Sequence, residues 1–326
     1  MIRMADGTTQ PYAVFLPERY DAKQAWPLVV FLHGSGESGA DGIRQTQVGL
    51  GPFISHYRKF CPFIAVFPQS PNYKIWFRGA EARVVFAIIE RVQKDYHVDP
   101  DRIYLTGISM GGFGTWEMAM MRPDLFAAIV PVCGGGPVEA VGNLKEMPIW
   151  AFHGASDDRV PVENTRRLIE RLKQLGADPK YTEFPMLGHM CWDDAYATKG
   201  LFPWLLKQKL PPPPTVMRLE LDLTWSSIPT TVRWLRIDAA EPGAKLMRVA
   251  AAITSATTVQ IESEGVGALT LLPERFPGAA SAGQPAAMTV AWQNRVAYKG
   301  PWRAEITMGR ATTRPARRGA DAPMAP

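Results

Sequence analysis

A Gly-x-Ser-x-Gly pentapeptide, Gly107–Gly111, presents Ser109 for nucleophilic chemistry. A short apolar, β-branched segment at 102–106 precedes it, and an amphipathic segment from 112 onward follows it. This strand–turn–helix context is typical of a nucleophile elbow, in which the serine stands at a strained corner between glycines that avoid the neighbouring backbone. The helix after the turn would aim its N-terminal N–H groups at charge developing near the hydroxyl. We therefore predict that Ser109 is a nucleophile.

A serine nucleophile needs a general base, and the sequence holds five histidines. His56 and His97 lie in polar stretches typical of solvated or capping residues. His33 and His153 each precede a glycine directly after a buried apolar segment, which suits fixing a loop by hydrogen bonds better than shuttling protons. His189 lies in a loop after the last predicted strand of the region, from where it can reach across the strand ends. We predict that His189 acts as base and then as acid.

The acid that orients this base should lie between the serine and the histidine in the sequence, because a nucleophile elbow is followed along the chain first by the acid and then by the histidine. The loop after the strand at 148–152 carries two adjacent aspartates. We choose Asp157, because the turn toward Val160-Pro161 should direct it inward. Asp158 stays open as the alternative, although it suits a position facing solvent, pairing with the next arginine or capping the helix. Asp193 and Asp194 lie too close to the predicted base to fit the order well.

A tetrahedral intermediate would need two N–H donors for its oxyanion. The backbone N–H of Met110, directly after the nucleophile, is one candidate. The other is expected from the glycine-rich loop His33–Gly39, with the N–H of Ser35 as our choice. A phosphate cradle is excluded for this loop, because it has neither a Walker lysine nor a G-x-G-x-x-G pattern.

Aromatic residues surround the predicted site in the sequence. Trp76, Phe77 and Trp192 fall in predicted loops, where large aromatic rings are harder to explain by packing alone. We predict that they bind substrate, flanking an aryl or acyl group. Phe113 and Trp116 lie in the helix after the elbow, and we expect them to belong to its buried face.

The region 1–210 alternates strand and helix patterns, which predicts an α/β fold with a mostly parallel sheet and helices on both faces. The stretch 40–60 reads as polar and irregular. Pro211–Pro214 marks a linker, and 215–309 is expected to form a β-rich, sandwich-like domain. The last segment, 310–326, is expected to be a disordered basic tail. The predicted strands of the β-rich domain are Arg218–Leu223, Val232–Ile237, Met247–Ala252, Thr257–Glu262, Ala268–Leu272, Met288–Trp292 and Ile306–Met308.

Charge and cysteine content exclude several classes of function. The net charge is +5, but four arginines and one aspartate in the segment 310–326 account for +3, so the rest is too weakly basic for nucleic acid. No apolar run is long enough to span a membrane. Cys61, Cys133 and Cys191 show no C-x-x-C or metal-binding spacing, and we expect buried free thiols although one bridge stays open. We predict no metal and no cofactor.

The compartment and the oligomeric state are not predicted. The start of the chain lacks the basic-then-apolar order of a signal peptide, and the sequence leaves a trimmed leader open.

Seven short motifs follow one another between about residues 10 and 208: Leu32–Glu37, Pro68-Gln69, Asp99–Arg102, Gly107–Gly112, Val130–Gly136, His153-Gly154-x-x-Asp157 and Gly188-His189-x-x-Trp192. Together they resemble the α/β-hydrolase superfamily, and within it the predicted-peptidase and esterase family related to feruloyl esterases, polyhydroxybutyrate depolymerases and dienelactone hydrolases. The resemblance implies the same three catalytic residues and the same oxyanion loop. Ser70 stands where the family usually has a cysteine, which speaks against a thiol or disulfide role at that loop.

These features predict a serine carboxylesterase that works through an acyl-enzyme on aryl, hydroxycinnamoyl or short-chain esters, or on polyesters. The expected partner is a small-molecule or polymer-linked ester. A serine peptidase of the same fold is the alternative, since it needs the same groups. A carbohydrate- or surface-binding protein with an inactive hydrolase domain would require a broken triad.

Overall fold

The computed structural model describes residues 1–3, 7, 9–71, 80–212, 215–223, 230–277, 287–293, 295–301, 303 and 305–309. No helix within these ranges is both long and apolar enough to cross a membrane. The proposed tail at 310–326 and part of the proline linker lie outside the described residues.

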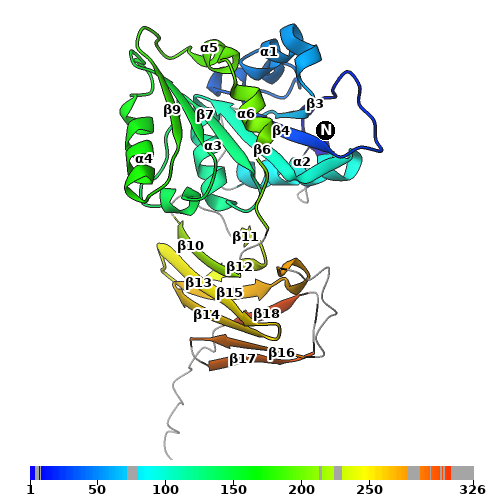
Figure 1. The fold of residues 1–326 in the computed structure, drawn as a ribbon, viewed down its shortest axis with the longest axis vertical. Coiled ribbons are helices and arrows are strands. Elements are labelled where there is room, and N and C mark those ends of the chain that lie inside the picture. Colours follow the sequence, from blue (N-terminus) through cyan, green and yellow to red (C-terminus); the bar gives the residue numbers. More distant parts are fainter. Residues whose placement is uncertain are drawn as a thin grey trace, which may run out of the picture.

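A seven-stranded sheet forms the centre of the first domain, in the spatial order β3-β5-β4-β6-β7-β8-β9 (Figure 1). Only β3 runs antiparallel, against β5, and the other neighbours pair in parallel. This confirms the predicted α/β fold with a mostly parallel sheet. The strands are β3 (Tyr12–Phe15), β4 (Trp26–Leu32), β5 (Ile64–Pro68), β6 (Val98–Ile108), β7 (Ala128–Val132), β8 (Trp150–Gly154) and β9 (Lys180–Phe184).

Helices cover both faces of this sheet, because alternate residues of each buried strand point to opposite sides. Leu28, Val30 and Leu32 of β4 pack with α2, α3 and α4, whereas Val29 and Phe31 pack with α1, α5 and α6. The helices are α1 (Leu50–Tyr57), α2 (Ala80–Asp95), α3 (Met110–Met121), α4 (Glu163–Gln174), α5 (Trp192–Ala197) and α6 (Leu201–Lys207). Short 3-10 turns lie at Ser35–Glu37, Arg44–Thr46, Arg58–Phe60 and Val141–Leu144, and a small hairpin pairs Ile2–Arg3 with Thr9–Gln10.

The expectation of an irregular stretch at 40–60 was wrong, because α1 begins at Leu50. Gly51 and Pro52 hide the helix in the sequence. Pro52 lies in the first helical turn, where its missing N–H breaks no helical hydrogen bond. Leu50 and Ile54 then form a buried i, i+4 pair against the sheet.

The β-rich region folds into two facing sheets, one of five strands in the order β10-β13-β14-β16-β17 and one of four in the order β11-β12-β15-β18. Inward side chains of both sheets form a single apolar core, with Trp234 fully buried. The strands are β10 (Val216–Asp222), β11 (Thr230–Val232), β12 (Leu235–Ala240), β13 (Leu246–Ser255), β14 (Thr258–Glu264), β15 (Val266–Leu271), β16 (Met288–Trp292), β17 (Arg295–Gly300) and β18 (Ile306–Gly309), and a 3-10 turn lies at Pro273–Arg275.

One predicted strand in this region, Val232–Ile237, was wrong as a single element. Arg233 has a φ of 54° and starts a tight turn, so that Val232 of β11 pairs with Leu235 of β12. A stretch of four apolar residues and two arginines hides such a turn, because nothing in it resembles the usual glycine or asparagine. Strand β17 was not predicted.

The sandwich packs against the amino-terminal edge of the parallel sheet (Figure 1). Asn143, shortly before β8, bonds the backbone of Glu220 through both ends of its amide. Asp124, in the turn before β7, accepts a hydrogen bond from the N–H of Arg233. The loops that carry the predicted chemistry follow the carboxyl ends of the strands, so they lie at the opposite edge of the sheet.

Candidate active site

The elbow at Ser109 has the strained geometry that its motif predicts. Ser109 has φ 52° and ψ −116° between β6 and α3, a conformation rare for a residue with a side chain. A Cβ on Gly107 would lie 2.4 Å from the carbonyl oxygen of Gly111, and one on Gly111 would lie 1.9 Å from that of Leu32. Both positions therefore require glycine, and the packed backbone holds the serine hydroxyl at the strand end.

The three residues predicted from the sequence lie within hydrogen-bond distance of one another. Ser109 Oγ is 2.9 Å from His189 Nε2, and His189 Nδ1 is 2.8 Å from Asp157 Oδ2. A carboxylate only accepts hydrogen bonds, so Nδ1 carries the imidazole proton and Nε2 is free to accept the proton of the serine. The arrangement can therefore deprotonate Ser109 as its oxygen attacks an electrophile.

The structure distinguishes the two adjacent aspartates. The side chain of Asp157 is fully buried, and its second oxygen, Oδ1, accepts hydrogen bonds from the N–H groups of Arg159 and Val160, whereas Asp158 is exposed. Burial alone would raise the pKa of Asp157, but the hydrogen bonds from His189 and these two N–H groups outweigh it and hold the pKa below its usual value. Asp157 is thus ionised where it meets the imidazole.

The predicted oxyanion donors, Met110 and Ser35, belong to two segments that lie next to Ser109. Met110 is the first residue of α3, directly after the nucleophile. On the other side, a Cβ built on Gly34 would lie 3.5 Å from the Cβ of Ser109, which places the loop containing Ser35 against the nucleophile. No contact in the described residues distinguishes the N–H of Ser35 from its neighbours, so its role stays a prediction.

His33 fixes this loop. Burial lowers its pKa to about 4, so the imidazole is neutral near pH 7. Nε2 accepts a hydrogen bond from the N–H of Ser70, so Nδ1 carries the proton and donates to the carbonyl of Gly34. The N–H of Ser35 belongs to the same trans peptide and points opposite to that carbonyl. His33 therefore sets the direction of the N–H that we predict to bind the oxyanion.

Gln69 and Glu37 also shape the loop, although the sequence predicts no role for either side chain. Gln69 Nε2 donates to the carbonyl of Glu37 and to Asp41, and its Oε1 accepts from the N–H of Gly42. Burial raises the pKa of Glu37, opposed by hydrogen bonds from the N–H of Gly34 and its own. The Pro68-Gln69 motif was the available signal, but its role depends on partners that lie far from it in the chain.

The aromatic residues divide as follows. The ring of Trp192 stands at 88° to that of His189, with centroids 5.7 Å apart, so it borders the predicted base. Trp76 and Phe77 lie outside the described residues. Trp116 is fully buried in the sheet–helix core and Phe113 is partly buried there. Met186 and Met190, not singled out from the sequence, are among the most exposed large apolar side chains and flank the base in sequence.

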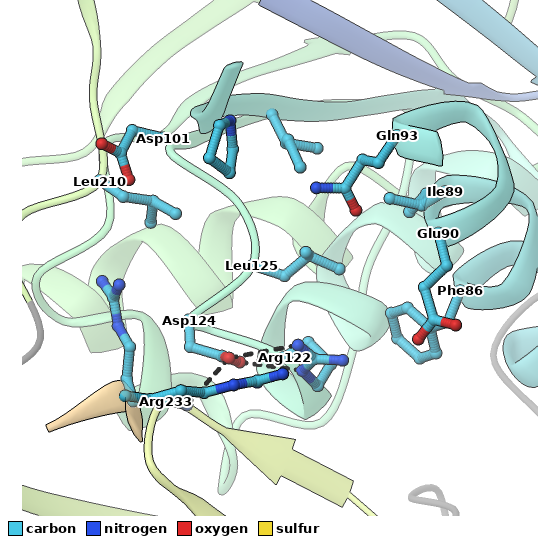
Figure 2. A pocket seen from close by; sticks show the side chains of 13 residues that line it. Phe86, Ile89, Glu90, Gln93, Asp101, Arg122, Asp124, Leu125, Leu210 and Arg233 are labelled. Atoms are coloured by element: carbon cyan, nitrogen blue, oxygen red, sulfur yellow. Dashed lines mark hydrogen bonds and ion pairs between the residues drawn. The ribbon is translucent and has the colours of Figure 1, made fainter. Parts of the chain in front are cut away.

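Two cavities in the described residues lie away from this site. One of about 450 Å³ is enclosed between α2, the start of β6 and the sandwich, with Asp124 between Arg122 and Arg233 (Figure 2). Its arginines are matched by Glu90, Asp101 and Asp124, so it carries no clear excess charge. Another of about 680 Å³ lies between the end of α4 and the outer face of β10 and β13. Both belong to the seam between the domains.

A thiol, an imidazole and a carboxylate approach within 4.8 Å at Cys133, His153 and Asp157, as a metal site would require. Asp157 is already bonded to His189, and His153 to Val160 and Thr165. A cation bound by these three residues would coordinate the carboxylate of Asp157, which would then no longer accept the hydrogen bond from His189. Metal binding here would therefore disrupt the predicted triad.

The first domain matches solved structures. A structure described as that of a thermostable esterase aligns with a TM-score of 0.59 and 34% identity, over 64% of this chain and 62% of the other. The first domain has the α/β-hydrolase fold. The sequence pattern of the prolyl oligopeptidase family matches residues 79–140 of this chain, around the elbow.

Two curated relatives of this chain carry esterase or depolymerase names. A poly(3-hydroxyalkanoate) depolymerase C of Paucimonas lemoignei is 33% identical over 122 residues, which are 33% of this chain and 28% of the relative. A probable feruloyl esterase C of Aspergillus niger is 29% identical over 189 residues, 56% of this chain and 67% of the relative. The chain thus spans under a third of the first of these relatives and about two thirds of the second.

Proposed function

We propose that this α/β-hydrolase is a serine carboxylesterase. The proposal is carried by the continuous hydrogen-bonded relay from Ser109 Oγ through His189 to the ionised Asp157. The names of the relatives, esterases and a polyester depolymerase, support the same class.

In the proposed reaction Ser109 Oγ attacks the ester carbonyl while His189 Nε2 takes its proton, and Asp157 stabilises the imidazolium. The N–H groups of Met110 and Ser35 hold the oxyanion. His189 returns the proton to the departing alkoxide, which leaves an acyl-enzyme. Water, deprotonated by the same base, then releases the acid.

For the substrate we propose an aryl or hydroxycinnamoyl ester. The support is the ring of Trp192 beside the base, since a flat aromatic wall gains most from an aryl group stacked or set edge-on against it. The exposed Met186 and Met190 add adaptable apolar surface on the same loop.

The test is a substrate panel of p-nitrophenyl acetate, methyl ferulate and a peptide anilide, with the natural chain and Ser109→Ala. We expect both esters to be cleaved, the ferulate with the higher kcat/KM. Ser109→Ala should lower kcat on the order of 10⁴- to 10⁶-fold. Ser156→Ala, an exposed serine in the loop after β8, is the matched control and should retain activity.

The peptidase alternative makes a different prediction in the same panel. It would be preferred if the anilide were cleaved with a higher kcat/KM than either ester. Equal activity of Ser109→Ala and the natural chain on all three substrates would reject serine catalysis altogether.

A further inference from the structure

Two buried thiols meet directly beneath the predicted base. Cys133 Sγ and Cys191 Sγ are 3.1 Å apart, although 58 positions separate them in the chain. Both side chains are fully buried. The third cysteine, Cys61, bonds the carbonyl of Tyr57 in α1 and takes no part in this pair.

The pair joins the two segments that must stay aligned for the relay. Cys133 directly follows Val132, whose carbonyl accepts the N–H of Ser109. Cys191 lies just after His189 in the chain, and the thiol of Cys133 also donates to the carbonyl of His189 at 3.1 Å. A covalent link here would therefore tie the strand beside the elbow to the loop of the base.

We propose that Cys133 and Cys191 form an intramolecular disulfide site that locks the loop of His189 onto the end of β7. A disulfide has an S–S length of about 2.05 Å, so the two sulfurs need to close by only about 1 Å. The reaction converts two thiols into one S–S bond and releases two protons and two electrons. Glutathione disulfide takes these up and leaves as two glutathione thiols.

The bond forms while the chain folds or when the loop opens. In the closed native state the thiols are sealed from solvent, and the hydrogen bond with Cys191 together with burial raises the pKa of Cys133, which suppresses the reactive thiolate. Cys133 also has a φ of 49°, so its side chain is held in place by a backbone conformation that few residues adopt. The native thiol pair is thus inert, and the folding conditions decide its state.

The test is to refold the full chain from denaturant with either a glutathione redox buffer or dithiothreitol, and to count thiols after denaturing again. We expect three thiols in the reduced sample. The oxidised sample should show one, assigned to Cys61 by peptide mapping. It should also show a melting temperature higher by roughly 5–10 °C, because the bond closes a long loop. Below their melting temperatures, the oxidised and reduced samples should hydrolyse p-nitrophenyl acetate at rates that agree within about twofold.

Serine variants test whether the higher melting temperature comes from the pair Cys133 and Cys191. Cys133→Ser and Cys191→Ser should each abolish the thermal gain, whereas Cys61→Ser should keep it. Three titratable thiols after oxidative refolding of the natural chain, or a bridge that includes Cys61, would overturn the proposal. That count needs no variant, so it decides the question even if a serine variant fails to fold.

Discussion

His153 Nε2 lies 3.2 Å from Asp157 Oδ2, the same oxygen that accepts the hydrogen bond from His189. The other neighbour of Nε2, the carbonyl of Val160 at 2.9 Å, is also an acceptor. Nε2 must therefore carry a proton, even though burial lowers the pKa of His153 and favours its neutral form. Asp157 thus lies between two imidazoles, one that it orients for chemistry and one that holds it in place.

Replacing this second imidazole should weaken catalysis through Asp157. We expect His153→Leu to lower kcat on the order of tenfold with little change in KM, because a buried hydrogen bond to a charged group contributes about 1.5–3 kcal/mol. Asp157 would lose one of the hydrogen bonds that hold its carboxylate in place, so it would orient His189 less well. His153→Gln, which keeps an N–H donor, should recover part of kcat. An unchanged kcat in His153→Leu would show that His153 does not position Asp157 for catalysis.

The two neighbouring aspartates form a matched pair of variants. Asp157→Asn should lower kcat on the order of 10⁴-fold, because an amide beside Nδ1 favours the wrong imidazole tautomer. Asp158→Asn changes an exposed carboxylate in the same loop and should stay within about twofold. Steady-state rates on p-nitrophenyl acetate measure both. Similar losses in the two variants would contradict the assignment of Asp157.

The buried His33 should make stability depend on pH. Its pKa falls from 6.5 to about 4 on folding, so between these values the unfolded chain binds a proton that the folded chain does not. The contribution of His33 is complete above pH 6.5 and is lost as the pH falls to 4, a decrease of about 3 kcal/mol. Urea unfolding of the natural chain and of His33→Gln across this window isolates the effect. Parallel pH dependences in the two proteins would refute it.

The contact between the domains should contribute to stability without affecting catalysis. Asn143 bonds the backbone of Glu220 and the carbonyl of Met120, at the edge of the sheet away from Ser109. Asn143→Ala should lower the free energy of unfolding by about 1–3 kcal/mol, because backbone groups lose their partners. The exposed Gln260→Ala is the control. A marked fall in kcat for Asn143→Ala at a temperature where it remains folded would show that the sandwich acts on the site.

Trp192 tests the proposed substrate class. Trp192→Ala should raise KM for methyl ferulate by about tenfold, since it removes an aromatic contact and the apolar area around it. The KM for p-nitrophenyl acetate, measured alongside, should change much less, because its acyl group is not aromatic. Trp204→Phe, an aromatic change that packs on Trp150 at the start of β8, should alter neither. Equal increases for both esters would count against an acyl-binding role.

Much of the fold followed from local patterns. The alternation of apolar strands and amphipathic helices predicts the parallel sheet, and the resemblance to α/β-hydrolases is confirmed by the esterase structure. The elements that escaped prediction are those whose local signal is masked. Pro52 and Gly51 disguise α1, and Arg233 adopts a turn conformation that its residue type rarely takes.

The same distinction applies to the site, where some residues could be predicted from the sequence and others depend on tertiary contacts. The Gly-x-Ser-x-Gly motif predicted Ser109, and loop position together with chain order predicted Asp157 and His189, because the fold brings successive strand ends together. The variants above test the roles of these three residues. The choice between Asp157 and Asp158 depends on a turn whose two N–H groups draw one carboxylate inward. The supports of the site depend on tertiary contacts that no spacing reveals. Gln69 braces a loop far upstream in the chain, and Cys133 meets Cys191 across 58 positions.

The position of the β-sandwich has a practical consequence. It packs against the amino-terminal edge of the parallel sheet (Figure 1), whereas Ser109 follows the carboxyl end of β6 at the opposite edge. A bead or electrode coupled to the sandwich would stand a whole domain away from the incoming ester, so immobilisation there should preserve turnover even on bulky polymers.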